Sequence, residues 1–305
     1  MKIVLFSEDR FGAEVLLEIL KTDEVTLVVC PYFDSNIHKR LETLCKAKHI
    51  EFYRTKNIND EYVLSKMKSE NFDLLVSCHC SRIIAKEIFT LPRLGAVNLH
   101  PSLLPKYRGM SPQHWPIING DKETAVTIHE IRENVDTGAI LKQIRVQINQ
   151  DENVCDIQNK MIPIYKQAFS ELLQDFKNNT VQHKEQESSK EIYYGKFYPE
   201  YSEINLRQTK ESVKNLVRAV THPYCGAWYK EYLIWYVSDV DEQTETQIMK
   251  KHSRCGIYKD ADSVFLRLFD GVLQLIDYSI NNTWWGGVLK YSVYLSISEK
   301  QGCVA

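Results

Sequence analysis

Asn98 and His100 are the first residues of this sequence whose types and spacing could do chemistry together. They lie in a stretch, Ala96–Pro101, that reads Ala-Val-Asn-Leu-His-Pro. Its apolar residues predict a short buried strand that ends at Pro101, because proline cannot donate to a sheet. Side chains alternate along a strand, so the amide and the imidazole point to the same face. Such a pair could stabilise a developing negative charge and exchange a proton near neutral pH.

Asp136 is the third candidate for chemistry. It lies in the polar loop Glu-Asn-Val-Asp-Thr-Gly of residues 133–138, after a strand predicted over 125–130. A carboxylate in such a loop could fix the tautomer of His100 and stabilise its charged form.

Two motifs resemble the folate-dependent formyltransferases. Residues 98–109 read Asn-Leu-His-Pro-Ser-Leu-Leu-Pro-Lys-Tyr-Arg-Gly, and residues 127–141 contain Thr-Ile-His, Val-Asp-Thr-Gly and Ile-Leu in that order. The resemblance covers most of residues 1–230 and is specific within these two motifs. It implies that 10-formyltetrahydrofolate donates a formyl group to an amine. It also implies that Asn98, His100 and Asp136 form the catalytic set.

The resemblance also implies where the folate binds. The folate is expected against two loops, largely through backbone groups. These cofactor-binding residues are Arg82, Ile83, Ile84, Asn134 and Val135. Ile83 and Ile84 could equally belong to the core. The residues expected to contact the acceptor substrate are Arg10, His79, Lys106, Tyr107 and Arg108. Arg10 could instead be a solvated surface residue, and Arg108 could serve only the loop structure.

Two further polar features are interpreted as structural. His129 is a rival imidazole at the end of the strand over 125–130, and the family treats the corresponding histidine as structural. The run Cys78-His79-Cys80 does not supply four ligands at the spacing of a closed zinc site. We therefore predict no metal.

The order of apolar segments predicts how these residues are positioned. Strands and helices alternate through residues 2–130, which is typical of an α/β, Rossmann-like, mostly parallel sheet with helices on both faces. Ligands of such sheets bind at the carboxyl ends of the strands. The first strand-to-helix turn lacks Gly-x-Gly-x-x-Gly, so a dinucleotide is not expected.

The chain is expected to form two domains. Residues 1–180 are the predicted catalytic domain, which a long amphipathic helix over 154–176 closes. A polar linker is expected over 181–200, followed by a small β-rich domain over 201–305 that is rich in Tyr, Trp, Val and Ile. Within it, Thr209 is expected to cap a helix.

Charge and composition narrow the class of protein. The 305 residues include 38 basic and 40 acidic residues, giving a net charge of −2, and no long basic run appears. A large nucleic-acid footprint therefore has no support in the sequence. No segment is apolar enough for a signal peptide or a membrane span, so a cytoplasmic protein with free thiols is expected.

Among the acceptors that the resemblance implies, the charge favours a nucleotide-linked amino sugar over tRNA. The expected acceptor is a dTDP-amino-dideoxyhexose for cell-surface polysaccharide, for example the O-antigen of lipopolysaccharide. Relatives that formylate methionyl-tRNA are the alternative, although they require a basic face. A non-catalytic scaffold that binds folate or nucleotide also stays open. The run Trp284-Trp285-Gly286-Gly287 predicts a subunit contact and hence a homodimer.

Overall fold

The computed structural model describes residues 1–8, 10–31, 39–187 and 193–280, and these divide into two compact units. The first unit comprises Met1–Pro112, Glu123–Gln147 and Gln158–Gly195. The second comprises Gln113–Lys122, Ile148–Ile157 and the chain from Lys196 onward. The domain boundaries expected at residues 180 and 200 stay predictions. The Trp284–Gly287 run lies outside the described residues.

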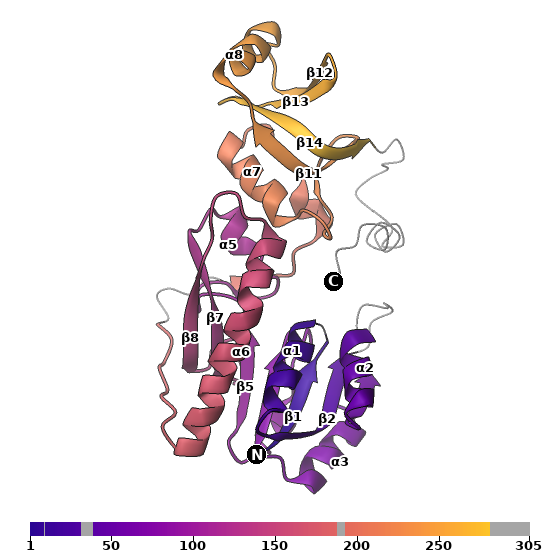
Figure 1. Cartoon of the computed structure of the whole chain (residues 1–305), viewed down its shortest axis with the longest axis vertical. Helices are drawn as coiled ribbons and strands as arrows, with labels where there is room; N and C mark the ends of the chain where they lie inside the picture. Colours follow the sequence, from indigo (N-terminus) through magenta and orange to yellow (C-terminus); the bar gives the residue numbers. More distant parts are fainter. Residues whose placement is uncertain (9, 32–38, 188–192, 281–305) are drawn as a thin grey trace. The chain divides into compact units, whose positions relative to one another are not determined.

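A seven-stranded sheet organises the described part of the first unit, in the order β3-β2-β1-β4-β5-β7-β8 (Figure 1). Its strands are β1 (Lys2–Ser7), β2 (Glu24–Pro31), β3 (Glu51–Thr55), β4 (Leu74–Cys78), β5 (Ala96–His100), β7 (Glu123–Glu130) and β8 (Ile140–Gln147). The first five strands pair in parallel, whereas β7 is antiparallel to both β5 and β8. The expected mostly parallel α/β sheet is therefore confirmed.

Helices cover both faces of this sheet. The helices described in the first unit are α1 (Arg10–Ile19), α2 (Lys39–Ala47), α3 (Glu61–Glu70) and α4 (Lys86–Phe89). The helix α6 (Val154–Asn178) agrees with the long helix predicted over 154–176. Val4 and Phe6 of β1 pack in a buried cluster with Val63 and Met67 of α3. Helix α1 contacts β1, β2 and β4. Because side chains alternate along β1, Ile3 is buried on the other face.

The carboxyl ends of β1, β4 and β5 lie along one edge of the sheet. The winding reverses between β1 and β4, which are direct neighbours. The Ser7 hydroxyl at the end of β1 donates to the Cys78 carbonyl at the end of β4 over 2.6 Å. The end of β5 is His100. Ligands of doubly wound sheets bind at such a reversal.

The second unit contains a five-stranded antiparallel sheet in its described part, with the order β10-β11-β14-β13-β12 (Figure 1). Its strands are β10 (Ala227–Tyr229), β11 (Tyr232–Asp239), β12 (Gly256–Asp260), β13 (Ser263–Arg267) and β14 (Val272–Ile280). The unit also contains α5 (Trp115–Ile118), η3 (Pro199–Ser202), α7 (Lys210–Ala219) and α8 (Glu242–Lys251). The β-rich C-terminal fold is confirmed, and no described helix is long and apolar enough to span a membrane.

Two helices of the second unit show what the sequence could predict. The Thr209 side chain accepts a hydrogen bond from the Ser212 N–H, so the expected cap of α7 is confirmed. Helix α8 was not expected, because residues 201–305 were predicted to be β-rich. Its Asp241 cap accepts from the Thr244 N–H, and Ile248 is its buried apolar residue. A polar helix of this kind gives almost no periodic signal.

Candidate active site

Strand β5 places Asn98 and His100 on one face at the edge of the sheet, as expected. β5 is parallel to β4 and antiparallel to β7, so Asn98 lies opposite His129 and His100 lies opposite Thr127. Both neighbouring strands fix the β5 backbone, and the two side chains therefore emerge at a defined spacing. His100 is buried, with 4% of its surface exposed, whereas Asn98 is half-buried.

Asp136 reaches these side chains from the loop between β7 and β8. Its Oδ1 lies 3.5 Å from Asn98 Nδ2, and its Oδ2 lies 3.6 Å from His100 Nδ1. The backbone N–H of Gly109 donates to the same Oδ2 over 2.8 Å. The structure thus brings the three predicted catalytic residues together, although they come from two distant segments.

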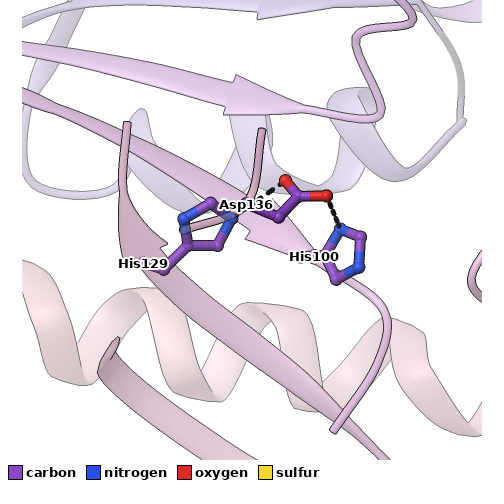
Figure 2. A group of neighbouring side chains, drawn as sticks. All are labelled: His100, His129 and Asp136. Carbon is purple, nitrogen blue, oxygen red and sulfur yellow. Dashed lines mark ion pairs between the residues drawn. The ribbon is translucent and has the colours of Figure 1, made fainter. Parts of the chain in front are cut away.

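His129 is a fourth member of the cluster. Its Nε2 lies 3.4 Å from Asp136 Oδ1 and 3.2 Å from Asn98 Nδ2. Figure 2 shows the Asp136 carboxylate between the two imidazoles, with one oxygen toward each ring. The histidine that the sequence interpretation treated as structural therefore touches two of the predicted catalytic residues. This role of His129 could have been predicted only from the pairing register of the two strands, which places His129 opposite Asn98.

Backbone carbonyls fix the tautomer of both histidines. His100 Nε2 lies 2.9 Å from the Tyr107 carbonyl, and His129 Nδ1 lies 2.7 Å from the Glu130 carbonyl. A carbonyl can only accept, so these two ring nitrogens carry hydrogen. Each neutral ring consequently turns its lone pair toward Asp136, at Nδ1 of His100 and at Nε2 of His129.

For both Asp136 and His100, burial and the neighbouring charges shift the pKa in opposite directions. Burial alone would raise the pKa of Asp136. The charges that His100 and His129 carry when protonated, together with the Gly109 N–H, hold that pKa well below its usual value. Burial lowers the pKa of His100, and the neighbouring Asp136 carboxylate opposes part of that shift. The resting site thus pairs an ionised Asp136 with a neutral His100, which gains stabilisation from the carboxylate when it takes up a proton.

The same three side chains could also hold a metal ion. One ligand atom from each of His100, His129 and Asp136 lies within 4.8 Å of the others among the described residues. Two imidazoles and a carboxylate suit a divalent transition metal, and both rings donate their remote N–H to a carbonyl as metal-bound histidines do. The expectation that the site uses no metal stays a prediction.

The two loops expected to bind the folate lie side by side. An ion pair between Lys86 and Glu133 joins the loop of residues 82–85 to the loop that carries Asn134 and Val135. Arg82 is exposed, and Ile83 is 71% exposed. Ile84, in contrast, is 6% exposed and packs in the core cluster of the sheet. Its side chain is therefore a core side chain, which was the alternative that the sequence left open.

Asn59 supports the first of these loops and was missed in the sequence. Its Nδ2 donates to the Ile83 carbonyl over 2.9 Å, and its Oδ1 accepts from the Ala85 N–H over 2.8 Å. In the second loop, the Asn134 carbonyl accepts from the Thr137 hydroxyl over 2.9 Å. Asn59 precedes a helix, and its sequence context gives no sign of partners 24 and 26 residues away.

Arg10 and His79, two of the residues expected at the acceptor, lie at the carboxyl edge of the sheet around Phe11. Arg10 donates to Gln158 over 3.2 Å and lies over the Phe11 ring. The His79 ring stacks on Phe11 at a centroid distance of 4.3 Å, and its Nε2 lies 3.0 Å from the Tyr165 hydroxyl. These contacts orient both side chains within the protein.

The other three expected acceptor residues form the turn after β5. Lys106 is exposed, whereas Tyr107 and Arg108 are each only 3% exposed. The Tyr107 carbonyl holds His100, and the Arg108 guanidinium donates to Gln186 Oε1 from Nε over 3.1 Å and from Nη2 over 2.8 Å. The contact of Arg108 with Gln186 supports the alternative that Arg108 serves the structure of the loop. The substrate roles of Lys106, Tyr107 and Arg108 stay predictions.

Comparisons with known proteins show which family the chain resembles. Residues 17–173, more than half of the chain, match the Formyl transferase family. Among curated proteins, a bifunctional polymyxin resistance protein ArnA from Wigglesworthia glossinidia brevipalpis is 31% identical over 249 residues, covering 77% of this chain and 37% of that protein. A methionyl-tRNA formyltransferase from Thermotoga maritima is 29% identical over 226 residues, covering 72% of each chain.

The fold also matches a solved structure, that of an N-formyltransferase from Helicobacter canadensis in complex with folinic acid and dTDP-3-aminofucose. The TM-score is 0.72 with 20% sequence identity, over 92% of this chain and 100% of that one. At this identity the likeness shows a shared fold. The family match, together with the converging Asn98, His100 and Asp136, establishes the class of enzyme. The chain belongs to the formyl transferase family, which confirms the resemblance found in its sequence and the predicted N-formyltransferase class.

Proposed function

We propose that this enzyme transfers the formyl group of 10-formyltetrahydrofolate to the primary amine of a nucleotide-linked amino sugar, with a dTDP-amino-dideoxyhexose as the expected acceptor. The observation that carries the proposal is the convergence of Asn98 Nδ2 and His100 Nδ1 on the Asp136 carboxylate, at 3.5 and 3.6 Å. An amide donor, a neutral imidazole and a buried carboxylate are what acyl transfer to an amine requires.

The loops beside the site fit a reduced folate. Backbone groups of residues 82–85 are held by Asn59, and the side chain of Ile83 stays exposed next to them. An exposed apolar side chain among ordered backbone donors and acceptors suits a flat heteroaromatic ring. When bound there, the folate supplies the formyl carbon that the amine attacks.

Asn98 would meet the negative charge that develops on the formyl oxygen. Its Nδ2 has two N–H groups, one directed at His129 Nε2 over 3.2 Å and one at Asp136 Oδ1 over 3.5 Å. The second contact is at the limit of a hydrogen bond, so a formyl oxygen beside this N–H would take it over from Asp136 Oδ1 at little cost. One such donor typically lowers the barrier by about 3–4 kcal/mol.

His100 would move the proton. The attacking amine forms a bond to the formyl carbon and loses a proton, which His100 takes up at Nδ1 beside Asp136 Oδ2. The carboxylate stabilises the imidazolium that forms, as the third residue of a hydrolytic triad does. The bond between the formyl carbon and N10 of the folate then breaks, and the proton passes from His100 to that nitrogen. Tetrahydrofolate and the N-formylated sugar leave, and His100 is neutral again.

Two observations favour a sugar over tRNA as the acceptor. The net charge of −2 does not favour the binding of a polyanion such as tRNA, since each phosphate contact requires a basic side chain. The Helicobacter canadensis enzyme with the same fold binds dTDP-3-aminofucose. A role in making cell-surface polysaccharide, such as the O-antigen of lipopolysaccharide, follows from this acceptor class and is part of the proposal.

A panel assay tests the proposal. The full chain is incubated with 10-formyltetrahydrofolate and, separately, with dTDP-linked amino sugars, UDP-linked amino sugars and aminoacylated initiator tRNA. Release of tetrahydrofolate and the mass of the acceptor are measured together. Formylation of a sugar nucleotide supports the proposal, and activity on the charged tRNA alone would overturn it. The homodimer stays a prediction, which the mass in solution tests.

A further inference from the structure

The segment 181–187, expected from its sequence to be part of a linker, runs along the loop that carries Asp136. Lys184 and Ile140 form an antiparallel bridge with backbone hydrogen bonds of 2.8 and 3.0 Å. His183 Nδ1 lies 2.8 Å from a carboxylate oxygen of Glu130, and Glu185 pairs with Arg132 over 2.7 Å. The segment is thus bound to the end of β7 and to the start of β8, the two strands that flank the loop.

Gln186 is the residue of this segment that enters the site. Its Nε2 donates to the Asp136 carbonyl over 2.8 Å and to the Gly138 carbonyl over 2.7 Å. Its Oε1 accepts from Arg108 Nε and Nη2 over 3.1 and 2.8 Å. A glutamine amide has two N–H donors and two acceptor positions, so every one of them is used.

These contacts hold Asp136 from two directions. Its backbone adopts φ +54°, in the left-handed region that most residues avoid, and the bonds of Gln186 to the carbonyls on either side of Thr137 fix that conformation. Arg108 directly precedes Gly109, whose N–H donates to Asp136 Oδ2. One amide therefore anchors both the backbone of Asp136 and the segment that binds its carboxylate.

We propose that Gln186 is a positioning residue for formyl transfer, which sets the Asp136 carboxylate against His100 and Asn98. This proposal rests on the proposed function. It assigns to the expected linker a part in the active site. His100 receives less stabilisation of its imidazolium when the carboxylate is free to move, so the proton transfer slows while the folding of the sheet is unaffected.

The test compares three variants of the full chain. Gln186→Ala removes all four hydrogen bonds. Gln186→Glu keeps an acceptor for Arg108 and loses both donors, so it separates the loop contact from the Arg108 contact. Gln182→Ala is the matched control, because this exposed glutamine on the same segment donates only to the nearby Thr180 carbonyl among the bonds described.

Both Gln186 variants are expected to lower kcat by about 10- to 100-fold with little change in KM or Tm, as a catalytic group misplaced by about 1 Å does. Gln182→Ala is expected to match the wild type. Equal kcat values for all four proteins would overturn the proposal. So would a loss of activity in the Gln186 variants that only follows a loss of folded protein.

A second measurement does not depend on the acceptor. The imidazole of His100, identified in NMR spectra through the variant His100→Asn, is titrated in each protein. A mobile Asp136 carboxylate attracts the imidazolium of His100 less strongly. The midpoint of the His100 titration is therefore expected to fall in Gln186→Ala and to stay constant in Gln182→Ala. An unchanged midpoint in Gln186→Ala would overturn the positioning role. A wild type that formylates no sugar would instead overturn the proposed function.

Discussion

Asn98 and His129 lie directly opposite each other on antiparallel strands, with Asn98 Nδ2 3.2 Å from His129 Nε2. The Glu130 carbonyl fixes hydrogen on the other nitrogen of His129, so the neutral ring can only accept from Asn98. This contact orients the amide whose second N–H is proposed to meet the formyl oxygen. The antiparallel pairing of β5 with β7 is what creates it.

The variant Asn98→Ala is expected to lower kcat by roughly 10²- to 10³-fold, because the donor to the developing oxyanion is lost. Binding of the folate should stay nearly unchanged, since the folate is expected to be held by the loops at 82–85 and 134–135. Steady-state kinetics and a fluorescence titration with the folate measure the two quantities. A variant with normal kcat would show that the oxyanion is stabilised elsewhere.

Replacing Asp136 by Asn should affect both activity and stability in acid. The pKa of this carboxyl lies below its unfolded value of 3.8, so its charge stabilises the folded state above pH 3.8. That stabilisation is lost as the pH falls through the folded-state pKa. Denaturant unfolding of Asp136→Asn is expected to show a lower free energy of unfolding than the wild type at pH 6, with a gap that narrows below pH 3.8. A gap independent of pH would contradict the inference.

Ile83 and Ile84 form a matched pair of neighbours that tests the loop expected to bind the folate. Ile84→Ala opens a cavity in the core cluster and is expected to lower the free energy of unfolding by about 2–5 kcal/mol. Ile83→Ala removes an exposed side chain, so its effect on stability should stay within about 0.5 kcal/mol. It should raise the KM for the folate. Equal stabilities of the two variants would contradict this division of roles.

His114 in the second unit should make stability depend on pH. Burial lowers the pKa of His114 below its ordinary value of 6.5, and the hydrogen bond to the Ala219 carbonyl opposes this shift. The unfolded chain therefore binds a proton first, and stability is full above about pH 6.5 and is lost as the pH falls toward the folded-state pKa. Urea unfolding from pH 7 to pH 5 should show a smaller loss in His114→Gln than in the wild type. His49→Gln, at an exposed position, is the control.

Zinc is expected to inhibit the enzyme. Zn²⁺ would take the lone pairs of His100 and His129 together with Asp136, whose ligand atoms lie within 4.8 Å of one another. Activity should fall as Zn²⁺ is added, return on addition of a chelator, and persist when the chelator alone is present. His129→Gln should weaken the inhibition. Loss of activity with the chelator alone would show that the reaction needs a metal.

Much of the first unit could be predicted because its signals are local. Continuous apolar runs predicted the buried strands β1, β2, β4 and β5, and the alternation along β5 predicted that Asn98 and His100 share a face. Strand β8 was not predicted, because its burial is mixed and does not alternate cleanly. The sequence also did not show that β7 runs antiparallel to β5, which is the pairing that places His129 opposite Asn98.

The parts of the site that could not be predicted depend on contacts between residues far apart in the sequence. Gln186 and Gln182 are the same residue type four positions apart in one polar stretch, and nothing near them in the sequence separates their roles. The three partners of Gln186 lie 48, 50 and 78 residues away. Asn59 is similar, since its bonds run to residues 83 and 85. A side chain that holds a loop in place can be recognised from the sequence only when that loop is close to it in the chain.

The position of Gln186 in the chain also has a consequence for biosynthesis. The seven strands of the first sheet and the three proposed catalytic side chains are encoded before residue 148. The Gln186 amide, which bonds to the loop of Asp136, comes 50 residues after that aspartate. During translation the sheet can therefore assemble well before its loop is fastened. If Gln186 positions Asp136 as proposed, a nascent chain reaches its full turnover rate only once residue 186 has left the ribosome.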